Sequence, residues 1–297
     1  MTVYYNDLNQ QVTLNKAIKS SGEGSVYGIV GLQGKVAKIY HPQKLQDDHD
    51  LAQKLQTMVA YPPDDPMKRY GHISIAWPES RLLAANGQFA GYLMPRIQQP
   101  HEIFEFYNPA VRQQQHPGVT WKNLHAIARN LAAALAAVHA RDYVVGDLNE
   151  GNIFVNDQSL VTLIDTDSFQ VRDPRSGWVY RCNVGKGAFT PVELQGLDLK
   201  SVDRQPYHDL FGLGVLLFHL LMEGYHPFTG VSRSQASISG QTVFERNIGQ
   251  GNFPYHPGSS FLPPPAAPTY NILHPQLQAM FRRCFLDGHK TPSARPT

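Results

Sequence analysis

Cysteine, charge and long apolar runs are all scarce in this chain. Its 297 residues contain two cysteines, Cys182 and Cys284, with no CxxC pair and no repeated Cys/His spacing of the kind that binds zinc. Both are expected to be reduced and inert, which fits a reducing cytoplasm and excludes a disulfide-stapled scaffold. Charged residues make up 17% of the chain and the net charge is only +2. That balance argues against nucleic acid or a membrane surface as the main partner.

A targeting segment and a membrane span are also missing from the pattern. Residues 1–7 lack the basic and apolar regions of a secretory signal peptide. The longest apolar stretch, residues 210–222, is interrupted by glycine and histidine and is too short to cross a bilayer. This stretch is therefore expected to be a buried helix of a cytoplasmic protein.

What is present predicts an α+β fold in two parts. Residues 1–98 show short alternating runs, a hairpin signal at Gly31–Gly34 and one helical pattern over 44–60. They are expected to form a small, mostly β lobe. Residues 99–297 are expected to form a larger, mostly helical lobe, because a long amphipathic pattern covers 120–140 and the later apolar segments have helical spacing.

The strongest chemical signal is the run VGDLNEGNIF over residues 145–154. It follows the end of the long predicted helix and places Asp147 and Asn152 in a tight loop before a predicted hairpin. Asp165 comes directly after that hairpin. One carboxylate can orient a nucleophilic hydroxyl, while an amide oxygen and a second carboxylate hold Mg²⁺. Phosphoryl transfer needs little more than such positioning and charge neutralisation.

This run resembles the catalytic loop of protein kinases, H-R-D-L-x-x-x-N followed by D-F-G. The resemblance implies a bilobal protein kinase-like fold that uses ATP and Mg²⁺. Asp147 would be the catalytic base, and Asn152 and Asp165 would be the metal ligands. Lys38, in Val36-Ala-Lys38, resembles the V-A-I-K lysine that contacts the α- and β-phosphates.

Further motifs follow in kinase order. Thr190–Leu194 resembles the A-P-E-L that ends the activation segment of kinases, the segment that follows D-F-G. Residues 209–215 resemble the start of the central kinase helix, and residues 224–228 resemble the G-x-x-P-F that follows it. The chain closes on an R-P-T, as the kinase pattern does. The resemblance implies a buried pair of Glu193 with Arg295. It also implies that Asp209 braces the catalytic-loop backbone, with His139 as a structural partner of that brace.

The nucleotide contacts implied by the resemblance come from the glycine loop, the lysine strand, the hinge and the catalytic loop. They are Gly22, Glu23, Gly24, Val26, Ala37, Lys38, Met94, Arg96, Asn149 and Phe154. Of the three family glycines only Gly24 is kept, since Lys19 and Ser21 occupy the other two positions. Met94 to Ile97 are expected to touch adenine.

Segments such as Gly22–Tyr27, Asp165–Gln170 and Gly251–Tyr255 resemble one bacterial group, the kinases linked to tellurite-resistance gene neighbourhoods. That resemblance implies a protein substrate and two partners, a von Willebrand A domain protein and a PP2C-type phosphatase. Some related chains carry a C-terminal helix-hairpin-helix module. This chain stops where the last helix of a kinase is expected to begin.

The pattern is broken in the helix that should hold Lys38. Kinases place a glutamate there, but residues 51–60 contain no acid. Gln53 and Gln56 remain as neutral candidates. After Asp165, Thr166 and Asp167 replace the Phe and Gly of D-F-G. Asp167 is expected to cap its own loop in preference to binding metal.

The catalytic loop departs from the pattern as well. Val145-Gly146 replaces the His-Arg pair, so activity is expected not to need phosphorylation of the activation segment. Asn149 replaces a lysine that neutralises the γ-phosphate, and Lys186 or Arg181 are candidates to replace it. The resemblance implies that Thr190 contacts the catalytic loop, as a threonine at this position does in kinases, which favours Ser/Thr substrates over Tyr.

The favoured interpretation is an ATP-dependent protein kinase that transfers the γ-phosphate to Ser/Thr hydroxyls of a protein. One alternative is a nucleotide-binding pseudokinase that acts as a scaffold, which the missing helix acid and Asn149 favour. A second keeps the fold but transfers AMP or phosphorylates a small molecule.

Overall fold

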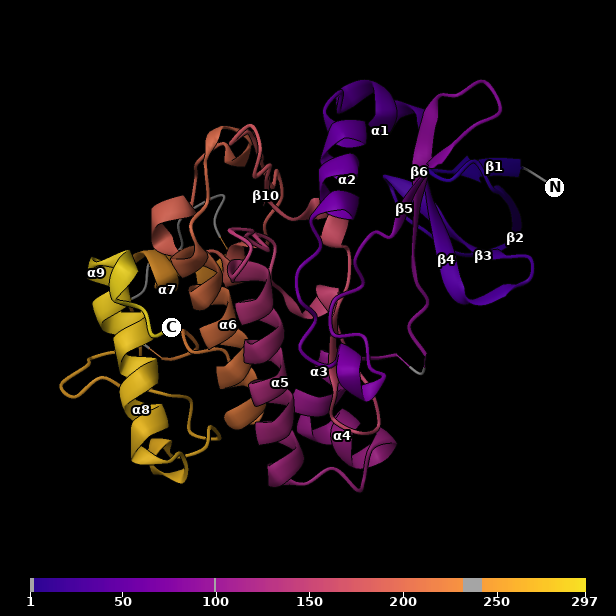
Figure 1. Cartoon of the computed structure of the whole chain (residues 1–297). Helices are drawn as coiled ribbons and strands as arrows, with labels where there is room; N and C mark the ends of the chain where they lie inside the picture. Colours follow the sequence, from indigo (N-terminus) through magenta and orange to yellow (C-terminus); the bar gives the residue numbers. More distant parts are fainter. Residues whose placement is uncertain (1–2, 99, 232–241) are drawn as a thin grey trace.

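The computed structural model describes residues 3–98, 100–231 and 242–297. Met1, Thr2 and Gln99, which marks the expected boundary between the two lobes, lie outside the described residues. The mixture of strands and helices confirms the predicted α+β class. Most strands gather at one end of the molecule and most helices at the other (Figure 1).

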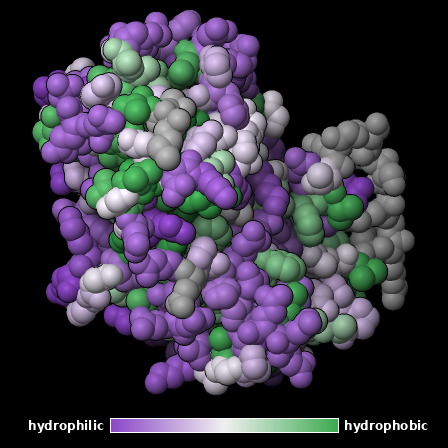
Figure 2. Space-filling model, turned by 90° about the vertical axis from the view of Figure 1, so that its right-hand side faces the viewer, coloured by the Kyte–Doolittle hydropathy of each residue, from purple (hydrophilic) through white to green (hydrophobic). Residues whose placement is uncertain are grey.

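Six antiparallel strands form the first part of the chain. They are β1 (Val3–Asn6), β2 (Gln11–Ser20), β3 (Gly24–Ile29), β4 (Leu32–Tyr40), β5 (Ser80–Leu83) and β6 (Phe89–Pro95). The strands are ordered β1-β2-β3-β4-β6-β5, and β1 also pairs with β5, so the sheet closes into a barrel. A small core of Val12, Leu14, Ala37 and Leu82 fills it. The face that carries the barrel is mostly hydrophilic, with apolar residues between (Figure 2).

The helical pattern predicted over 44–60 is two helices, α1 (Pro42–Asp47) and α2 (Leu51–Ala60). The break falls on Asp48, whose backbone is not helical. Aspartate is a poor residue for a helix interior because its short side chain competes for nearby backbone groups. Helix α2 buries Leu51, Leu55 and Met58 in the main core of the protein. That contact fixes which of its other side chains face inward.

The helical part is built around α5 (Trp121–His139) and α6 (Pro206–Leu221), which pack against each other. Its other helices are α3 (Ile103–Tyr107), α4 (Pro109–Gln115), α7 (Val243–Gly249), α8 (Pro275–Arg282) and α9 (Gly288–Lys290), with a π-helical turn (Arg283–Asp287) between the last two. The expected start of α5 at Thr120 is confirmed, since Asn123 Oδ1 accepts the Thr120 N–H at 2.9 Å. None of the described helices is both long and apolar enough to span a membrane.

A three-stranded sheet joins the two parts, with β7 (His101–Glu102), β8 (Ile153–Val155) and β9 (Val161–Leu163) in that order. The predicted hairpin over 152–164 is therefore confirmed. A two-stranded ribbon, β10 (Val171–Arg172) and β11 (Val179–Tyr180), follows it.

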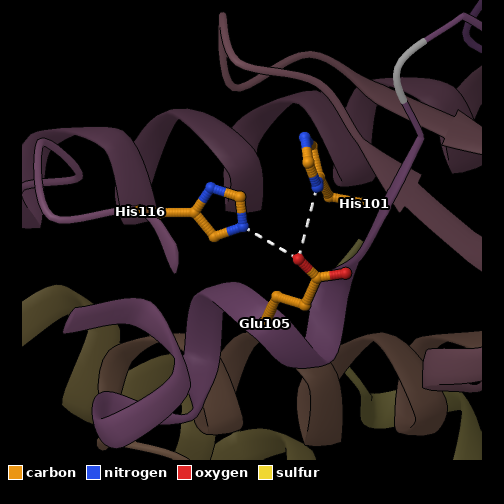
Figure 3. A group of neighbouring side chains, drawn as sticks. All are labelled: His101, Glu105 and His116. Carbon is orange, nitrogen blue, oxygen red and sulfur yellow. Dashed lines mark hydrogen bonds and ion pairs between the residues drawn. The ribbon is translucent and has the colours of Figure 1, made fainter. Parts of the chain in front are cut away.

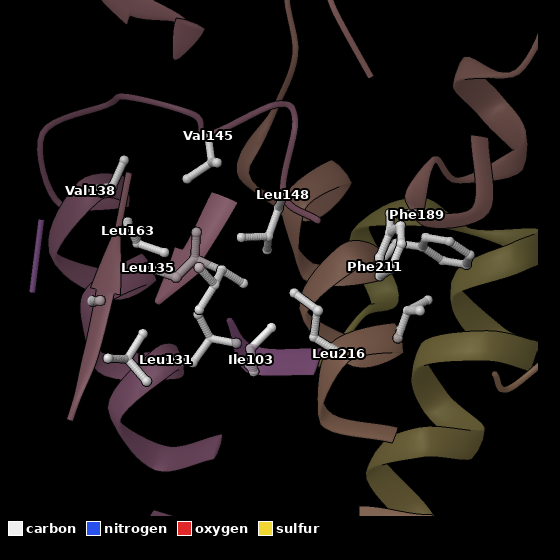
Figure 4. Close-up of a cluster of buried hydrophobic side chains, with 14 of the residues drawn as sticks. Ile103, Leu131, Leu135, Val138, Val145, Leu148, Leu163, Phe189, Phe211 and Leu216 are labelled. Atoms are coloured by element: carbon white, nitrogen blue, oxygen red, sulfur yellow. The ribbon is translucent and has the colours of Figure 1, made fainter. Parts of the chain in front are cut away.

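The catalytic-loop candidate is anchored in the main core from both sides. Val145 and Leu148 are 1% and 3% exposed and lie among side chains of α5, α6 and β9 (Figure 4). Asp147, between them, is half-buried. The packing of the two apolar neighbours therefore holds Asp147 in a fixed position, while its carboxylate stays within reach of solvent.

Candidate active site

A large cavity of about 1240 Å³ opens between the barrel strands, the hinge after β6 and the β8 strand. Ten of the predicted site residues line it: Gly22, Glu23, Gly24, Val26, Lys38, Met94, Arg96, Asn152, Phe154 and Asp165. Its volume exceeds the common range for small-molecule sites, roughly 300–1,000 Å³. A nucleotide would fit inside it.

Three predicted residues do not line this cavity. Ala37 is fully buried in the barrel core, because it alternates with Lys38 along β4. Asn149 accepts the Gly151 N–H through Oδ1 at 2.9 Å and donates to the Asp147 carbonyl, so it caps the 3-10 turn Glu150–Asn152. Asp147 lies on the same loop, outside the cavity lining.

The glycine loop is a short hairpin turn between β2 and β3. Ser21 N–H donates to the Gly24 carbonyl at 2.9 Å, and Lys44 of α1 donates to the Glu23 carboxylate at 3.0 Å. A side chain at position 24 would bring its Cβ within 2.5 Å of the Ile39 carbonyl oxygen. The last family glycine is therefore required by the close approach of the neighbouring strand.

Lys38 is the centre of a buried polar cluster. Its Nζ lies 2.9 Å from Asp165 Oδ1, and 2.9 and 2.7 Å from the two carboxylate oxygens of Asp167. Tyr40 donates to Asp167 at 2.6 Å and Tyr92 donates to it at 2.8 Å. Both oxygens of Asp167 therefore receive charged and neutral hydrogen bonds in a site closed to solvent.

The local structure explains why these side chains meet. Lys38 and Tyr40 are two residues apart on β4 and share the face turned away from the barrel core, and Tyr92 is paired directly opposite Lys38 on β6. Asp165, two residues after the end of β9, has a left-handed backbone conformation with φ +55°. The Thr166 hydroxyl donates to the Ala76 carbonyl at 2.9 Å, which anchors the turn that carries both aspartates.

The two aspartates differ in charge state and in exposure. Burial alone would raise the pKa of Asp167, but Lys38 and the two tyrosine hydroxyls lower it to about 2. Burial and the neighbouring Asp167 raise the pKa of Asp165. Burial opposes the charge of Lys38 too, yet the two carboxylates raise its pKa. Asp167 is thus the permanent counterion of Lys38, whereas the Asp165 side chain is 42% exposed toward the cavity.

The prediction that Gln53 or Gln56 holds Lys38 is wrong. Both glutamines are exposed, and Gln56 accepts a hydrogen bond from Arg81 instead. The inward side chain of α2 is Lys54, which is 7% exposed. The prediction that Asp167 caps its own loop is also wrong, because its hydrogen bonds go to Lys38, Tyr40 and Tyr92.

The predicted brace of the catalytic loop is confirmed. His139 Nε2 lies 2.9 Å from Asp209 Oδ2, and the Asp209 carboxylate accepts the N–H groups of Val145 and Gly146 at 2.8 Å each. Asn152 Nδ2 donates to the Asp147 carbonyl at 3.0 Å. These bonds fix the backbone on both sides of Asp147.

Arg204, from a later segment, lies beside Gly146, the residue that replaces the arginine of the kinase His-Arg pair. Gly146 has φ +76°, and a Cβ there would come within 2.7 Å of Arg204 Nη1 and of Cys182 Cβ. Arg204 is 2% exposed and donates to the Val184 carbonyl at 2.6 Å. The guanidinium thus holds the activation segment through a backbone carbonyl, and Gly146 leaves room for it.

The remaining charged candidates pair as follows. Lys186 forms an ion pair with Glu150 of the catalytic loop, whereas Arg181 pairs with Asp203 at 2.7 Å, outside that loop. Of the two, Lys186 is the one that contacts the loop. The Thr190 hydroxyl donates to the Lys186 carbonyl at 3.0 Å, within its own segment, and not to the catalytic loop as expected.

The pair of Glu193 with Arg295 is confirmed. The guanidinium binds the carboxylate through both terminal nitrogens, with Nη2 at 2.9 Å from Oε2, and Arg295 is 1% exposed. It also donates to the carbonyls of Tyr207 and Gly288. This bidentate pair ties the end of the activation segment to the end of the chain.

Comparison with known proteins points to the kinases. The chain is 35% identical over 300 aligned residues, 99% of its length, to the protein named Protein kinase YegI in Escherichia coli O157:H7 and in Escherichia coli strain K12. It spans only 44% of the length of those relatives. A probable serine/threonine-protein kinase, irlB of Dictyostelium discoideum, is 29% identical over 118 residues, 36% of this chain and 8% of its own length.

No protein-family model matches the chain. The similarity to proteins named as kinases, over nearly the whole chain, nevertheless agrees with the ordered motifs and with the geometry around Lys38. The chain is therefore similar, from end to end, to part of a bacterial protein kinase.

Proposed function

We propose that this chain is the bilobal kinase region of a cytoplasmic protein, which transfers the γ-phosphate of ATP to a Ser or Thr hydroxyl of a protein. The observation that carries the proposal is the cluster at Lys38. A lysine held by a permanent counterion points into a nucleotide-sized cavity, next to a second carboxylate that is partly free. That arrangement supplies charge neutralisation without a glutamate on the helix.

The donor set at the cavity fits a Mg²⁺ ion. Asp165 and Asn152 both line the cavity, and no described hydrogen bond uses Oδ2 of Asp165 or Oδ1 of Asn152. Carboxylate and amide oxygens are the ligands Mg²⁺ prefers. When bound, the ion would neutralise charge on the phosphates. Asp167 would stay on Lys38, since its two oxygens are already saturated.

Asp147 would orient the acceptor hydroxyl and take its proton. It is half-buried, its carbonyl is held by Asn149 and Asn152, and its neighbours are packed in the core. Lys186, held by Glu150 on the same loop, would supply the positive charge that the loop lacks at Asn149. The substrate class rests on the resemblance and on the position of Thr190.

We also infer that a von Willebrand A domain protein and a PP2C-type phosphatase are the partners of this enzyme. The support is the resemblance of its glycine-loop, Asp165–Gln170 and Gly251–Tyr255 segments to kinases of tellurite-resistance neighbourhoods. Pull-down of the two partner classes with this chain would test it, and Asp147→Ala, which should lose phosphoryl transfer, would show whether binding depends on catalysis.

The central experiment uses Mg²⁺ and ATP labelled separately on the α- and γ-phosphates. Label from the γ position alone should reach protein, and it should be lost in Asp147→Ala and Asp165→Asn. Asp64→Asn is the matched control, because the side chain of Asp64 is 98% exposed and lies on no site element.

Label from the α position would replace the proposal by AMP transfer. Nucleotide binding without transfer to any protein, including the chain itself and the inferred partners, would replace it by the scaffold. The missing loop lysine favours that second candidate.

A further inference from the structure

A cluster of two histidines and a glutamate lies just past the hinge, outside the nucleotide cavity. His101 is on β7, Glu105 is on α3, and His116 follows the end of α4. Figure 3 shows the Glu105 carboxylate rising from α3 between the two imidazole rings. Its Oε2 lies 2.9 Å from His116 Nε2 and 3.3 Å from His101 Nδ1, and the three atoms are within 4.8 Å of one another. We propose that these three side chains bind one Zn²⁺ ion.

The donor atoms select the metal. Two imidazole nitrogens and one carboxylate oxygen suit zinc, whereas Mg²⁺ and Ca²⁺ prefer sites made of oxygen. Zinc binds nitrogen at about 2.0–2.1 Å, so the ligand atoms of a tetrahedral site are roughly 3.3 Å apart. Two of the three separations are already 2.9 and 3.3 Å. The two ring nitrogens lie within 4.8 Å of each other, so completing the site requires the rings to approach by up to about 1.5 Å.

The groups behind the ligands orient them as outer ligands of zinc sites do. His101 presents Nδ1 to the cluster, and its other ring nitrogen, Nε2, lies 3.4 Å from Asp157 Oδ1. A metal-bound histidine commonly donates its second N–H to such a carboxylate. Glu105 Oε1 accepts the Glu102 N–H at 3.0 Å, which leaves Oε2 for the metal.

His116 is held by packing. The ring of Phe106 stacks on it at 4.5 Å with an angle of 14° between the planes. The side chains of His101, Glu105 and His116 are 32%, 21% and 9% exposed. The three ligands are therefore ordered in advance, and an ion can reach them from solvent.

Hydrogen bonds account for each pair when the two rings both donate to the same oxygen of Glu105. A neutral His101 that donates through Nδ1 would, however, turn an unprotonated Nε2 toward the Asp157 carboxylate. Zinc bound to Nδ1 would leave the proton of His101 on Nε2, where it faces Asp157, and would leave a fourth position on the metal for water.

The place of the site indicates its role. Strand β7 pairs with β8, with His101 opposite Val155 and Glu102 opposite Phe154. Phe154 and Asn152 line the nucleotide cavity. Zinc would therefore tie β7, which is paired with the β8 strand at the cavity, to α3 and to the end of α4. The role is structural, and it does not depend on the proposed function.

The test is zinc binding by the whole chain, purified with chelator and then dialysed against Zn²⁺. Elemental analysis should find one zinc per chain, and His116→Ala and Glu105→Gln should lose it. Asp157→Asn should keep the stoichiometry and weaken binding about 10- to 100-fold. His49→Ala is the matched control for an exposed histidine elsewhere, and Asp165→Asn separates this site from the nucleotide site.

Glu105→Gln keeps the shape of the side chain, so this variant tests zinc binding even if His116→Ala fails to fold. Zinc should raise the unfolding temperature of the wild type and of Asp165→Asn, but not that of Glu105→Gln. A zinc content near zero in the wild type overturns the proposal. Equal zinc content in the wild type and in Glu105→Gln overturns it as well.

Discussion

Two lysines are buried in the described part of this protein, and their surroundings are opposite. Lys38 is 6% exposed and Lys54 is 7% exposed. Lys38 has two carboxylate partners, which raise its pKa in spite of burial. Among the described residues, no side chain or carbonyl accepts a hydrogen bond from the Lys54 ammonium, and burial lowers its pKa. Burial penalises both charges, so the counterion makes the difference.

The comparison shows how the site departs from the kinase pattern. The helix that should supply an acid supplies Lys54, and the acid comes instead from Asp167, at the position of the D-F-G glycine. Asp167 is held by Lys38, Tyr40 and Tyr92. The carboxylate that orients Lys38 has thus moved from the helix to the segment that also carries Asp165.

The largest effect is expected for Asp167→Asn. The change would leave Lys38 with only the partly exposed Asp165 as a counterion, and breaking a buried ion pair costs about 3–5 kcal/mol. Urea unfolding should show this loss, and phosphoryl transfer should fall with it. Asp165→Asn is the matched change: Lys38 keeps Asp167, so stability should change by less than about 1 kcal/mol, while transfer is lost. The reverse order of stabilities would show that Asp165 is the true counterion.

A middle-sized effect is expected for Tyr40→Phe and for Tyr92→Phe. Each removes one hydrogen bond to a charged carboxylate, worth about 1.5–3 kcal/mol. The same changes made in Asp167→Asn should cost much less, because the charged acceptor is gone. For each tyrosine, urea unfolding of the wild type, the two single variants and the double variant measures this coupling. Equal costs in both backgrounds would mean that the hydroxyls act through packing alone.

Lys54→Met should raise the free energy of unfolding, whereas the changes above lower it. Replacing an unpaired buried charge by an apolar side chain should stabilise the protein by about 1 kcal/mol near pH 7. The folded pKa of Lys54 lies below its ordinary value of 10.5, so the penalty is complete below that folded pKa. The penalty shrinks as the pH rises toward 10.5.

Unfolding at several pH values measures this trend, and the advantage of Met should fade at high pH. Lys38→Met is the control, because it leaves the buried Asp167 carboxylate without its cationic partner and should destabilise the protein. A Lys54→Met variant that loses stability at neutral pH would show that Lys54 has a partner.

The smallest effect is expected for Gln53→Ala and Gln56→Ala. Both side chains are exposed and neither contacts Lys38, so stability should stay within about 0.5 kcal/mol. Nucleotide affinity, measured by calorimetry, should be unchanged. A marked loss of affinity in either variant would return the helix to the role of holding Lys38.

The sequence predicted the parts of the site that depend on motif order. The brace of His139 with Asp209 and the pair of Glu193 with Arg295 follow from recognisable motifs, so each partner could be assigned without coordinates. The hairpin after Asn152 was equally predictable, because its turn residues and alternation are local.

The partner of Lys38 could not be found in the same way. Asp167 lies 129 residues away, and its position depends on how the segment after β9 packs under the barrel. A signal was present, since Tyr40 puts a hydroxyl on the same strand face as Lys38, and a buried hydroxyl needs a partner. The break between α1 and α2 was missed because the apolar spacing continues across it.

The Arg204 contact has a consequence for timing. Because Arg204 already holds this segment through the Val184 carbonyl, we infer that the segment needs no prior phosphorylation to take its working shape. For a phosphotransferase, product should then accumulate linearly from the first moment, with no lag, and specific activity should not rise with enzyme concentration. If the proposed function holds, the rate would then depend on the supply of the acceptor protein.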